Sequence, residues 1–271
     1  MPQRSSRDSF TDFLLHFSSV KIWNNGLLVA APMGQGIYMK REHQDWESLP
    51  GGLPEGVHVN RLNVERGRLF ACTNLGLFEF DEQVDSWRDT GLALSSFHVK
   101  ATAGTLWAAT QYGLWAAQTA KGWLKIACST QFVYDFLHIP EYLILALEDG
   151  IKVYDRLTGG WMNFGMQQAV IGLAMYQGHF LGITEKGALL CSNQKGSFEQ
   201  IRFPHLFLFS LVTKGQEVYA CTDRGLYRIS KIGGRITLLS VRLGCPVTDI
   251  DCSADMLYMA TLFQGIQRIS I

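Results

Sequence analysis

A short pattern of apolar and polar positions recurs seven times along the chain. It reads apolar-aromatic-small-small-Thr, two variable residues, then Gly-apolar-aromatic, and its clearest copies are LWAATQYGLW at 106–115 and VYACTDRGLY at 218–227. Each copy holds two strand-type runs around a glycine-bearing turn, which predicts a β-hairpin. The marker glycines lie 37 to 40 residues apart and are Gly36, Gly76, Gly113, Gly150, Gly187, Gly225 and Gly265.

A fixed repeat of this length predicts a repeat architecture, and four short strands per repeat are typical of a β-propeller blade. An outer strand follows each hairpin at Trp46, Trp87, Trp123, Trp161, Phe198 and Ile236. The inner strands begin near Val59, Ser96, Val133, Val170, Leu208 and Val247. Because no stretch has helical periodicity, we predict an all-β chain, residues 1–271, that forms one seven-bladed β-propeller with four-stranded antiparallel blades.

The seventh repeat stops after its third strand, so something else has to cover its edge. Ser9 to Phe13 (SFTDF) lies ten residues before Val20, and the similar SFEQI at 197–201 lies ten residues before Leu208. We therefore expect residues 9–16 to form the outer strand of blade 7. This N-terminal strand would complete the C-terminal blade, protect an exposed edge and close the ring.

The phrases LWAATQYGLW and VYACTDRGLY resemble the propeller repeats of two-component regulator sensor domains, whose pattern runs roughly Leu-Trp-Val-Gly-Thr-x-x-Gly-Leu-Tyr. The resemblance covers every repeat, and it implies the propeller fold. In that family such repeats usually form extracytoplasmic ligand-sensing modules joined to a kinase. Because no signal peptide, membrane span or kinase is recognisable here, we do not expect the sensory role to carry over.

Composition narrows the classes of function. Lys plus Arg is 24 and Asp plus Glu is 24, so the chain has none of the basic excess that nucleic-acid backbones select for. The absence of a secretory signal and of long apolar runs predicts a cytoplasmic protein without a membrane partner. Six cysteines without a CxxC spacing predict reduced core thiols, and we expect neither a metal site nor a cofactor. The repeated Trp46, Trp87, Trp123 and Trp161 are expected to pack in the blades, and the repeated threonines Thr73, Thr110, Thr184, Thr222 and Thr261 to make one hydrogen bond per blade.

The inner strands carry the candidate site, because propellers usually bind ligands at a mouth of the central channel. Two residues after each apolar start comes a mostly polar column, which we call the polar column: Ser19, Arg61, His98, Asp135, Gly172, Ser210 and Asp249. The next position is apolar in every blade. This alternation predicts that one side packs between blades while the polar column faces a wet channel. Residues one position earlier, which include Asn60, Phe97, Tyr134 and Phe209, are expected at the same mouth.

Three interpretations of the polar column stay open. Its charges could simply neutralise one another in a hydrated channel. The chain could be a module that binds a small anionic ligand or a protein, using Arg61, Asn60, Phe97, Tyr134, Ser210, Phe209, Asp249 and Ser19. It could also be a lyase, hydrolase or isomerase, in which Arg61 holds an anion, His98 moves a proton and Asp135 orients the imidazole. An exposed apolar patch would favour a protein partner, and Phe203 to Phe207 and Leu262-Phe263 are the places to look for one.

Overall fold

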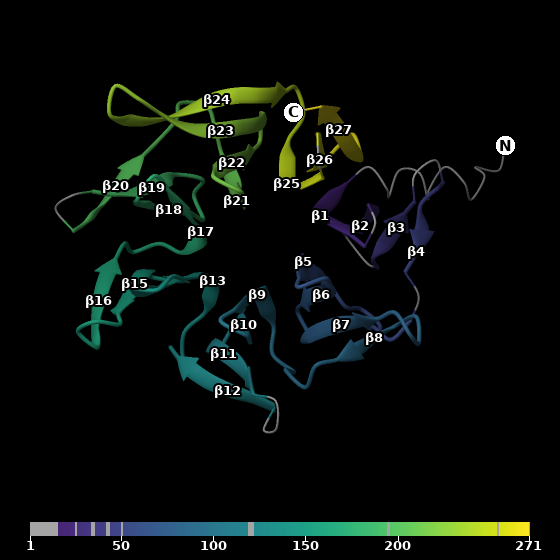
Figure 1. Ribbon diagram of the computed structural model, residues 1–271. Coiled ribbons are helices and arrows are strands. Elements are labelled where there is room, and N and C mark those ends of the chain that lie inside the picture. The colour runs from purple at the N-terminus through teal and green to yellow at the C-terminus, as the bar shows by residue number, and fades with distance from the viewer. Residues whose placement is uncertain are drawn as a thin grey trace, which may run out of the picture.

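The computed structural model is a ring of seven β-sheets around a central axis, with the first strand of each sheet innermost (Figure 1). It describes residues 16–24, 26–33, 36–41, 44–49, 51–118, 122–193, 196–253 and 255–270. Within these residues no helix is long and apolar enough to cross a membrane. The all-β, seven-bladed prediction is therefore confirmed.

The first four blades each contain four antiparallel strands, which follow one another in chain order from the inner strand outward. Blade 1 contains β1 (Phe17–Trp23), β2 (Leu27–Pro32), β3 (Tyr38–Lys40) and β4 (Glu47–Ser48). Blade 2 contains β5 (Val59–Glu65), β6 (Arg68–Thr73), β7 (Leu77–Asp81) and β8 (Ser86–Asp89). Blade 3 contains β9 (Ser96–Thr102), β10 (Thr105–Thr110), β11 (Gly113–Gln118) and β12 (Gly122–Ala127). Blade 4 contains β13 (Val133–His138), β14 (Tyr142–Leu147), β15 (Gly150–Asp155) and β16 (Gly160–Gly165).

The last three blades continue the same order. Blade 5 contains β17 (Val170–Tyr176), β18 (His179–Thr184), β19 (Leu189–Ser192) and β20 (Phe198–Ile201). Blade 6 contains β21 (Leu208–Lys214), β22 (Glu217–Thr222), β23 (Gly225–Ile232) and β24 (Arg235–Leu243). Blade 7 has three strands among the described residues, β25 (Val247–Ser253), β26 (Met256–Thr261) and β27 (Ile266–Ser270). The inner strands of blades 2 to 7 begin at the residues that the repeat predicted.

The hairpin between the second and third strands explains the repeated threonine and glycine. The Thr110 hydroxyl donates to the Gly113 carbonyl oxygen over 2.9 Å, and the Thr222 hydroxyl donates to the Gly225 carbonyl oxygen over 2.8 Å. At Gly113 the backbone has a positive φ of 97°, and a Cβ atom would lie 2.3 Å from the Ala127 carbonyl oxygen. Only glycine fits so close to the outer strand. Thr73 and Thr261 repeat the hydroxyl-to-carbonyl bond, and Thr184 instead accepts from the Ala188 amide.

Packing within and between blades buries most of the repeated hydrophobic residues. Trp87 is 3% exposed, as predicted, because it packs against Phe80 in a core cluster, whereas Trp161 on the outer strand β16 is 45% exposed. All six cysteines lie in the described chain and are free, and Cys72 and Cys221 are fully buried. Burial raises the pKa of both thiols to about 12. They are core residues, as their place in the repeat predicted.

The ring closes where blade 7 meets blade 1, because β25 packs beside β1 (Figure 1). The Thr248 hydroxyl donates to the Phe17 carbonyl oxygen over 2.7 Å, and Phe17, Val20 and Ala30 share an apolar cluster with Ala260. The outer strand expected from residues 9–16 falls on residues that, except for His16, lie outside the described part of the chain. His16 itself is in no strand, and its ring meets Phe263 edge-on.

Deletion of residues 1–13 tests the expected closure of blade 7. We expect this deletion to lower the melting temperature, because it would remove the strand that the sequence predicts for the edge of blade 7. A matched deletion of residues 1–7, which keeps the SFTDF segment, should leave the melting temperature close to that of the full chain. Differential scanning calorimetry of the three proteins makes the comparison, and equal melting temperatures would contradict the expected strand.

Candidate functional site

A β-bulge near the start of every inner strand sets the geometry of the channel mouth. In all seven blades the inner strand pairs with the second strand, and the register of this pairing shifts after the first residue of the inner strand. The residue left out of the pairing is Ser18, Asn60, Phe97, Tyr134, Ile171, Phe209 or Thr248 in blades 1 to 7. A bulge re-aims side chains locally, so these residues and the polar column that follows them do not alternate as in a regular strand.

The polar column reaches across to the next blade. The Asp249 carboxylate accepts a hydrogen bond from the Val20 amide over 3.1 Å, and the Asp135 carboxylate accepts one from the Leu173 amide over 2.8 Å. The Ser19 hydroxyl accepts from the Leu62 amide over 3.2 Å. The prediction of a wet channel lining is therefore wrong for these three side chains, which are buried. An inner strand has no strand partner on its channel side, so its amides need acceptors from the neighbouring blade.

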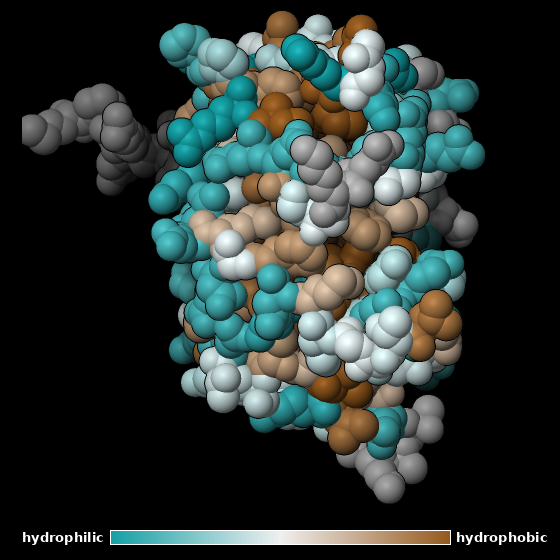
Figure 2. Space-filling model, turned by 90° about the vertical axis from the view of Figure 1, so that its left-hand side faces the viewer, coloured by the Kyte–Doolittle hydropathy of each residue, from teal (hydrophilic) through white to brown (hydrophobic). Residues whose placement is uncertain are grey.

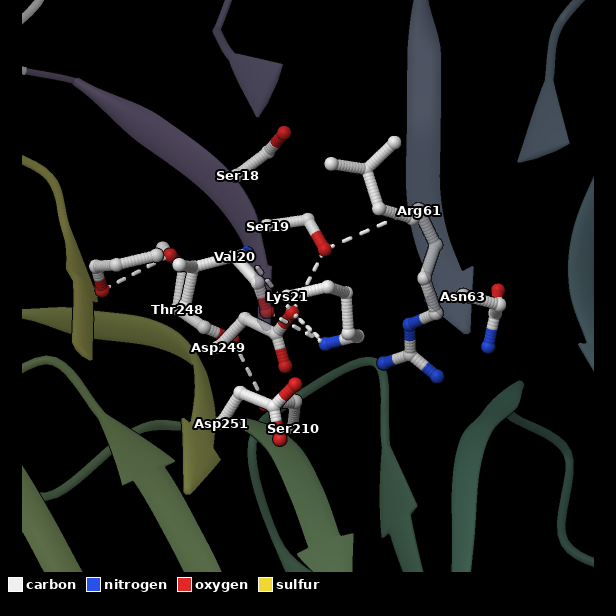
Figure 3. A network of polar contacts seen from close by, with 12 residues as sticks. Ser18, Ser19, Val20, Lys21, Arg61, Asn63, Ser210, Thr248, Asp249 and Asp251 are labelled. Carbon is white, nitrogen blue, oxygen red and sulfur yellow. Dashed lines mark hydrogen bonds and ion pairs between the residues drawn. The ribbon is translucent and has the colours of Figure 1, made fainter. Parts of the chain in front are cut away.

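Two aspartates of blade 7 are the centre of the polar network where the ring closes (Figure 3). Asp249 accepts from the Ser19 hydroxyl over 2.6 Å and from the Lys21 ammonium over 2.5 Å. Asp251 accepts from the Ile22 amide over 2.8 Å and pairs with Lys214. These bonds hold blades 6, 7 and 1 together. The predicted Ser210 lies nearby and donates its hydroxyl hydrogen to the Thr248 carbonyl oxygen over 2.8 Å.

A second network joins blades 2, 3 and 4 and brings together the predicted Arg61, His98 and Asp135. Asp135 Oδ1 lies 2.7 Å from His98 Nδ1 and 2.7 Å from Lys100 Nζ. Arg61 NH1 lies 3.0 Å from His98 Nδ1. Burial alone would raise the pKa of Asp135, but Lys100 and the hydrogen-bonded His98 outweigh it and hold this pKa below its usual range.

His98 is neutral at physiological pH. Burial, followed by the charges of Lys100 and Arg61, lowers its pKa to about 3 despite the opposing carboxylate of Asp135. Since Asp135 is ionised, the neutral ring is best satisfied when Nδ1 carries the proton and donates it to Oδ1. Nε2 then keeps a free lone pair. This tautomer leaves Nδ1 unable to accept a hydrogen bond from Arg61.

Arg61 forms no ion pair with a carboxylate of the described part of the chain. Burial would raise the pKa of Asp135 and of Asp249, and the charge of Arg61 adds to that of Lys100 and Lys21, respectively, in lowering them. Lys21, Lys100 and Lys214, the lysines of the inner strands around it, each pair with an aspartate. The side chain of Arg61 projects beside Lys21, and no hydrogen bond joins it to Asp249 or Asp251 (Figure 3). At the same level blade 5 has Gly172, where an added Cβ atom would meet nothing within 4 Å. Glycine therefore places no side chain on the inner wall of blade 5 at this position.

The inner strands all begin on one face of the ring, which we call the mouth face. Aromatic residues gather there. The ring of Phe97 lies 5.1 Å from that of Tyr134 and 5.9 Å from that of Phe132, which is 37% exposed. The rings of Phe207 and Phe209 lie 5.5 Å apart in blade 6. Asn60 is committed within the protein, because its side-chain amide donates to the Ser96 carbonyl oxygen over 2.8 Å.

The two segments expected to form an apolar patch are only partly exposed in the structure. Phe203 and Leu206 pack against the core cluster between blades 5 and 6, while Phe207 is 38% exposed. Phe263 is 60% exposed in the hairpin turn of blade 7. Hairpin turns of blades 1 to 3 add three exposed residues on the same face, Met33, Leu75 and Tyr112. These turns adjoin the segments that enter the inner strands, as the bond from the Leu262 amide to the Pro246 carbonyl shows for blade 7.

Sequence reasoning missed the lysines of this site. Lys21 and Lys100 follow the polar column by two residues, as does Asp251, so the two-residue strand period could have placed them on the same side. In the described chain, no group of three or more His, Cys, Asp or Glu side chains is arranged to hold a metal ion. A cavity of about 1170 Å³ lies between blades 7, 1 and 2, lined by Trp46 and Tyr258 among others, and it includes none of the predicted site residues.

No protein-family model and no curated protein sequence matches this chain. Solved structures do match it. The extracellular domain of the putative hybrid two-component system BT4673 from B. thetaiotaomicron is similar, with a TM-score of 0.72 and 14% identity, over 93% of this chain and 38% of that one. This chain therefore spans well under half the length of that relative.

Two further similar structures match over nearly their whole length. Virginiamycin B lyase from Staphylococcus aureus has a TM-score of 0.74 and 10% identity, over 96% of this chain and 97% of that one. A chain of the mitotic checkpoint complex has a TM-score of 0.70 and 14% identity, over 96% of this chain and 90% of that one. At such identities the likeness shows the fold alone, which is the seven-bladed β-propeller. The resemblance to two-component sensor propellers is thus confirmed at the level of fold.

Asp249→Ala tests whether the network around blade 7 holds the ring closed. We expect the free energy of unfolding to fall by about 3 kcal/mol, because Lys21 loses its partner and the Val20 amide loses its acceptor in a buried place. Urea denaturation measures this loss. Asp155→Ala removes a partly exposed carboxylate whose hydrogen bonds stay within one turn, to Leu157 and Thr158, and it should cost much less. Equal losses in the two variants would contradict the assigned role.

The low pKa of His98 predicts acid sensitivity. The folded protein keeps this ring neutral down to about pH 3, whereas the unfolded chain protonates it below its ordinary pKa of 6.5. The free energy of unfolding therefore falls as the pH drops below 6.5, by up to about 2 kcal/mol between pH 7 and pH 5. Urea denaturation at the two pH values should show a smaller loss for His98→Gln than for the wild type. The same loss in both proteins would exclude His98 as its source.

Proposed function

We propose that the chain is a binding module that takes an anionic ligand at the mouth of its central channel, with Arg61 as the anion-binding group. One observation carries the proposal. The neighbouring inner-strand lysines have aspartate partners, and Arg61 has no anionic partner among the described residues. A guanidinium group in such a place favours a carboxylate or phosphate, which it can bind through two parallel hydrogen bonds.

The position of Arg61 in the polar column supports a role other than closure of the ring. Asp249, Ser19 and Asp135 each accept a hydrogen bond from an amide of the next blade. Arginine has only donors, so Arg61 cannot serve such an amide. A hydroxyl or carboxylate at this position would continue the pattern. The donor found there instead is available to a ligand.

The surroundings indicate what kind of anion fits. Phe97, Phe132 and Tyr134 present aromatic surface at the mouth, and Gly172 places no side chain at the same position of blade 5. We therefore expect a carboxylate with an apolar or aromatic body rather than a bare inorganic ion. A protein partner could also place an acidic side chain in the mouth. Its apolar contacts would then come from the exposed residues of the same face, which are Phe263, Met33, Leu75 and Tyr112.

An enzyme is the second candidate, and the contact between His98 and Asp135 favours it. Asp135 orients the neutral imidazole through Nδ1, so Nε2 is free to take a proton from a ligand held by Arg61. The low pKa of His98 makes this ring a weak base. The similar fold of virginiamycin B lyase is an analogy and assigns no chemistry to these residues.

Thermal-shift measurements and calorimetry with benzoate, phenylacetate, succinate, citrate and phosphate test the proposal. We expect at least one carboxylate with an apolar body to raise the melting temperature and bind saturably, because a ligand of the folded state stabilises it. Arg61→Ala should abolish the shift while staying folded. Arg242→Ala, which removes the same charge on the outer strand β24, should keep the shift. No saturable binding, or equal binding in both variants, would refute the proposal.

The same ligand distinguishes the second candidate. Mass spectrometry after prolonged incubation shows whether the bound compound is converted. Conversion that is lost in His98→Gln, while binding is kept, would identify an enzyme. Binding without conversion leaves the binding module as the function.

A further inference from the structure

Strand β16 is the least protected outer edge of the ring. It pairs with β15, and no other strand of the described chain covers its second side. Its sequence, GWMNFG, contains no charged residue and no proline. The other outer strands of blades 1 to 6 carry at least one charged residue each, at Glu47, Arg88, Lys125, Glu199 and Arg235. Charges on edge strands are a common protection against pairing with another chain, and β16 lacks it.

Apolar side chains project on both faces of this edge. Trp161 is 45% exposed and Met162, the next residue, is 43% exposed on the opposite face of the strand. Leu157, in the turn that leads into β16, is 93% exposed. Figure 2 faces the side of the ring where β15, β16 and β20 lie in Figure 1, and brown and tan surface crosses it between hydrophilic borders. The edge is therefore apolar as well as uncharged.

The edge strand packs against the neighbouring strand β15 and against blade 5. The ring of Trp161 packs against that of Tyr154 on β15 at 5.0 Å, and the ring of Phe164 meets Phe198 of blade 5 edge-on at 5.2 Å. The pairing with β15 is regular along all six residues of the strand. Half of the backbone amides and carbonyls of such a strand point away from β15, in the geometry that another strand requires.

We propose that β16 pairs antiparallel with β16 of a second copy of this chain, so that two propellers join through one continuous eight-stranded sheet. In a twofold antiparallel pair each side chain lies on the same face as the residue opposite, so a residue must lie on the symmetry axis opposite its own copy. Asn163 suits that place, because two side-chain amides can hydrogen-bond to each other. Uncharged edges also meet without repulsion between like charges.

The register centred on Asn163 gives complementary neighbours. Met162 then lies opposite Phe164 of the second copy, a favourable contact between a thioether and an aromatic ring. Trp161 lies opposite Gly165 of the second copy, where an added Cβ atom would meet nothing within 4 Å, so the indole ring has room. Each contact occurs twice around the axis. A second copy therefore supplies a strand that pairs with this edge without any charged residue.

Analytical ultracentrifugation over a wide concentration range tests the dimer. We expect the wild-type mass to rise from one chain to two with concentration. Asn163→Lys should remain a monomer, because two like charges would lie directly opposite each other. Leu124→Lys, a matched change at an exposed residue of the outer strand β12, should still dimerise. Arg61→Ala should dimerise too, so failure of the ligand proposal does not affect this result.

Cross-linking provides a measurement that does not depend on disrupting the strand. Asn163→Cys should form a reducible dimer under mild oxidation, because the two cysteines face each other across the axis. Leu124→Cys should not. A wild-type monomer at every concentration, or a dimer that persists in Asn163→Lys, would overturn the proposal. Cross-linking of Leu124→Cys to the same extent as Asn163→Cys would overturn the assigned edge.

Discussion

The hydrogen bond from an inner-strand amide to a side chain of the preceding blade is the interaction on which this ring depends. An inner strand has a strand partner on one side only, so its amides on the channel side need another acceptor. Asp249, Ser19, Asp135 and Glu65, which accepts from the Ala101 amide, provide such acceptors in four of the seven junctions. Because each acceptor comes from the neighbouring blade, the same bond satisfies the backbone and orients two blades.

The electrostatics of the channel follow from this arrangement. A buried aspartate is stable only when cations and donors surround it, and Lys21, Lys100 and Lys214 provide the charge. His98 stays neutral because burial and the nearby cations outweigh the carboxylate of Asp135. Most of the charged side chains of the inner strands therefore stabilise the contacts between neighbouring blades. Arg61 is the exception, since it can cap no amide and no anion of the described chain pairs with it.

The mouth and the rim are separate surfaces with different chemistry. At the mouth, bulged residues such as Phe97 and Tyr134 combine aromatic surface with an unpaired guanidinium group, which suits an anion with an apolar body. At the rim, β16 offers unpaired backbone groups and uncharged side chains, which suits another β-strand. The two surfaces lie on different strands of the ring, so that one can be altered without the other.

The sequence alone determined the number of blades, the first residue of the inner strands in blades 2 to 7, and the hairpin bond of the repeated threonine. Each follows from a local pattern of residues, and the same pattern occurs in each repeat. The sequence also placed Arg61, His98 and Asp135 in neighbouring blades. Only the tertiary structure decided that Asp135 and Asp249 serve the next blade and that Arg61 has no anionic partner. Those facts depend on a bulge in each inner strand and on distances between blades, and periodicity specifies neither.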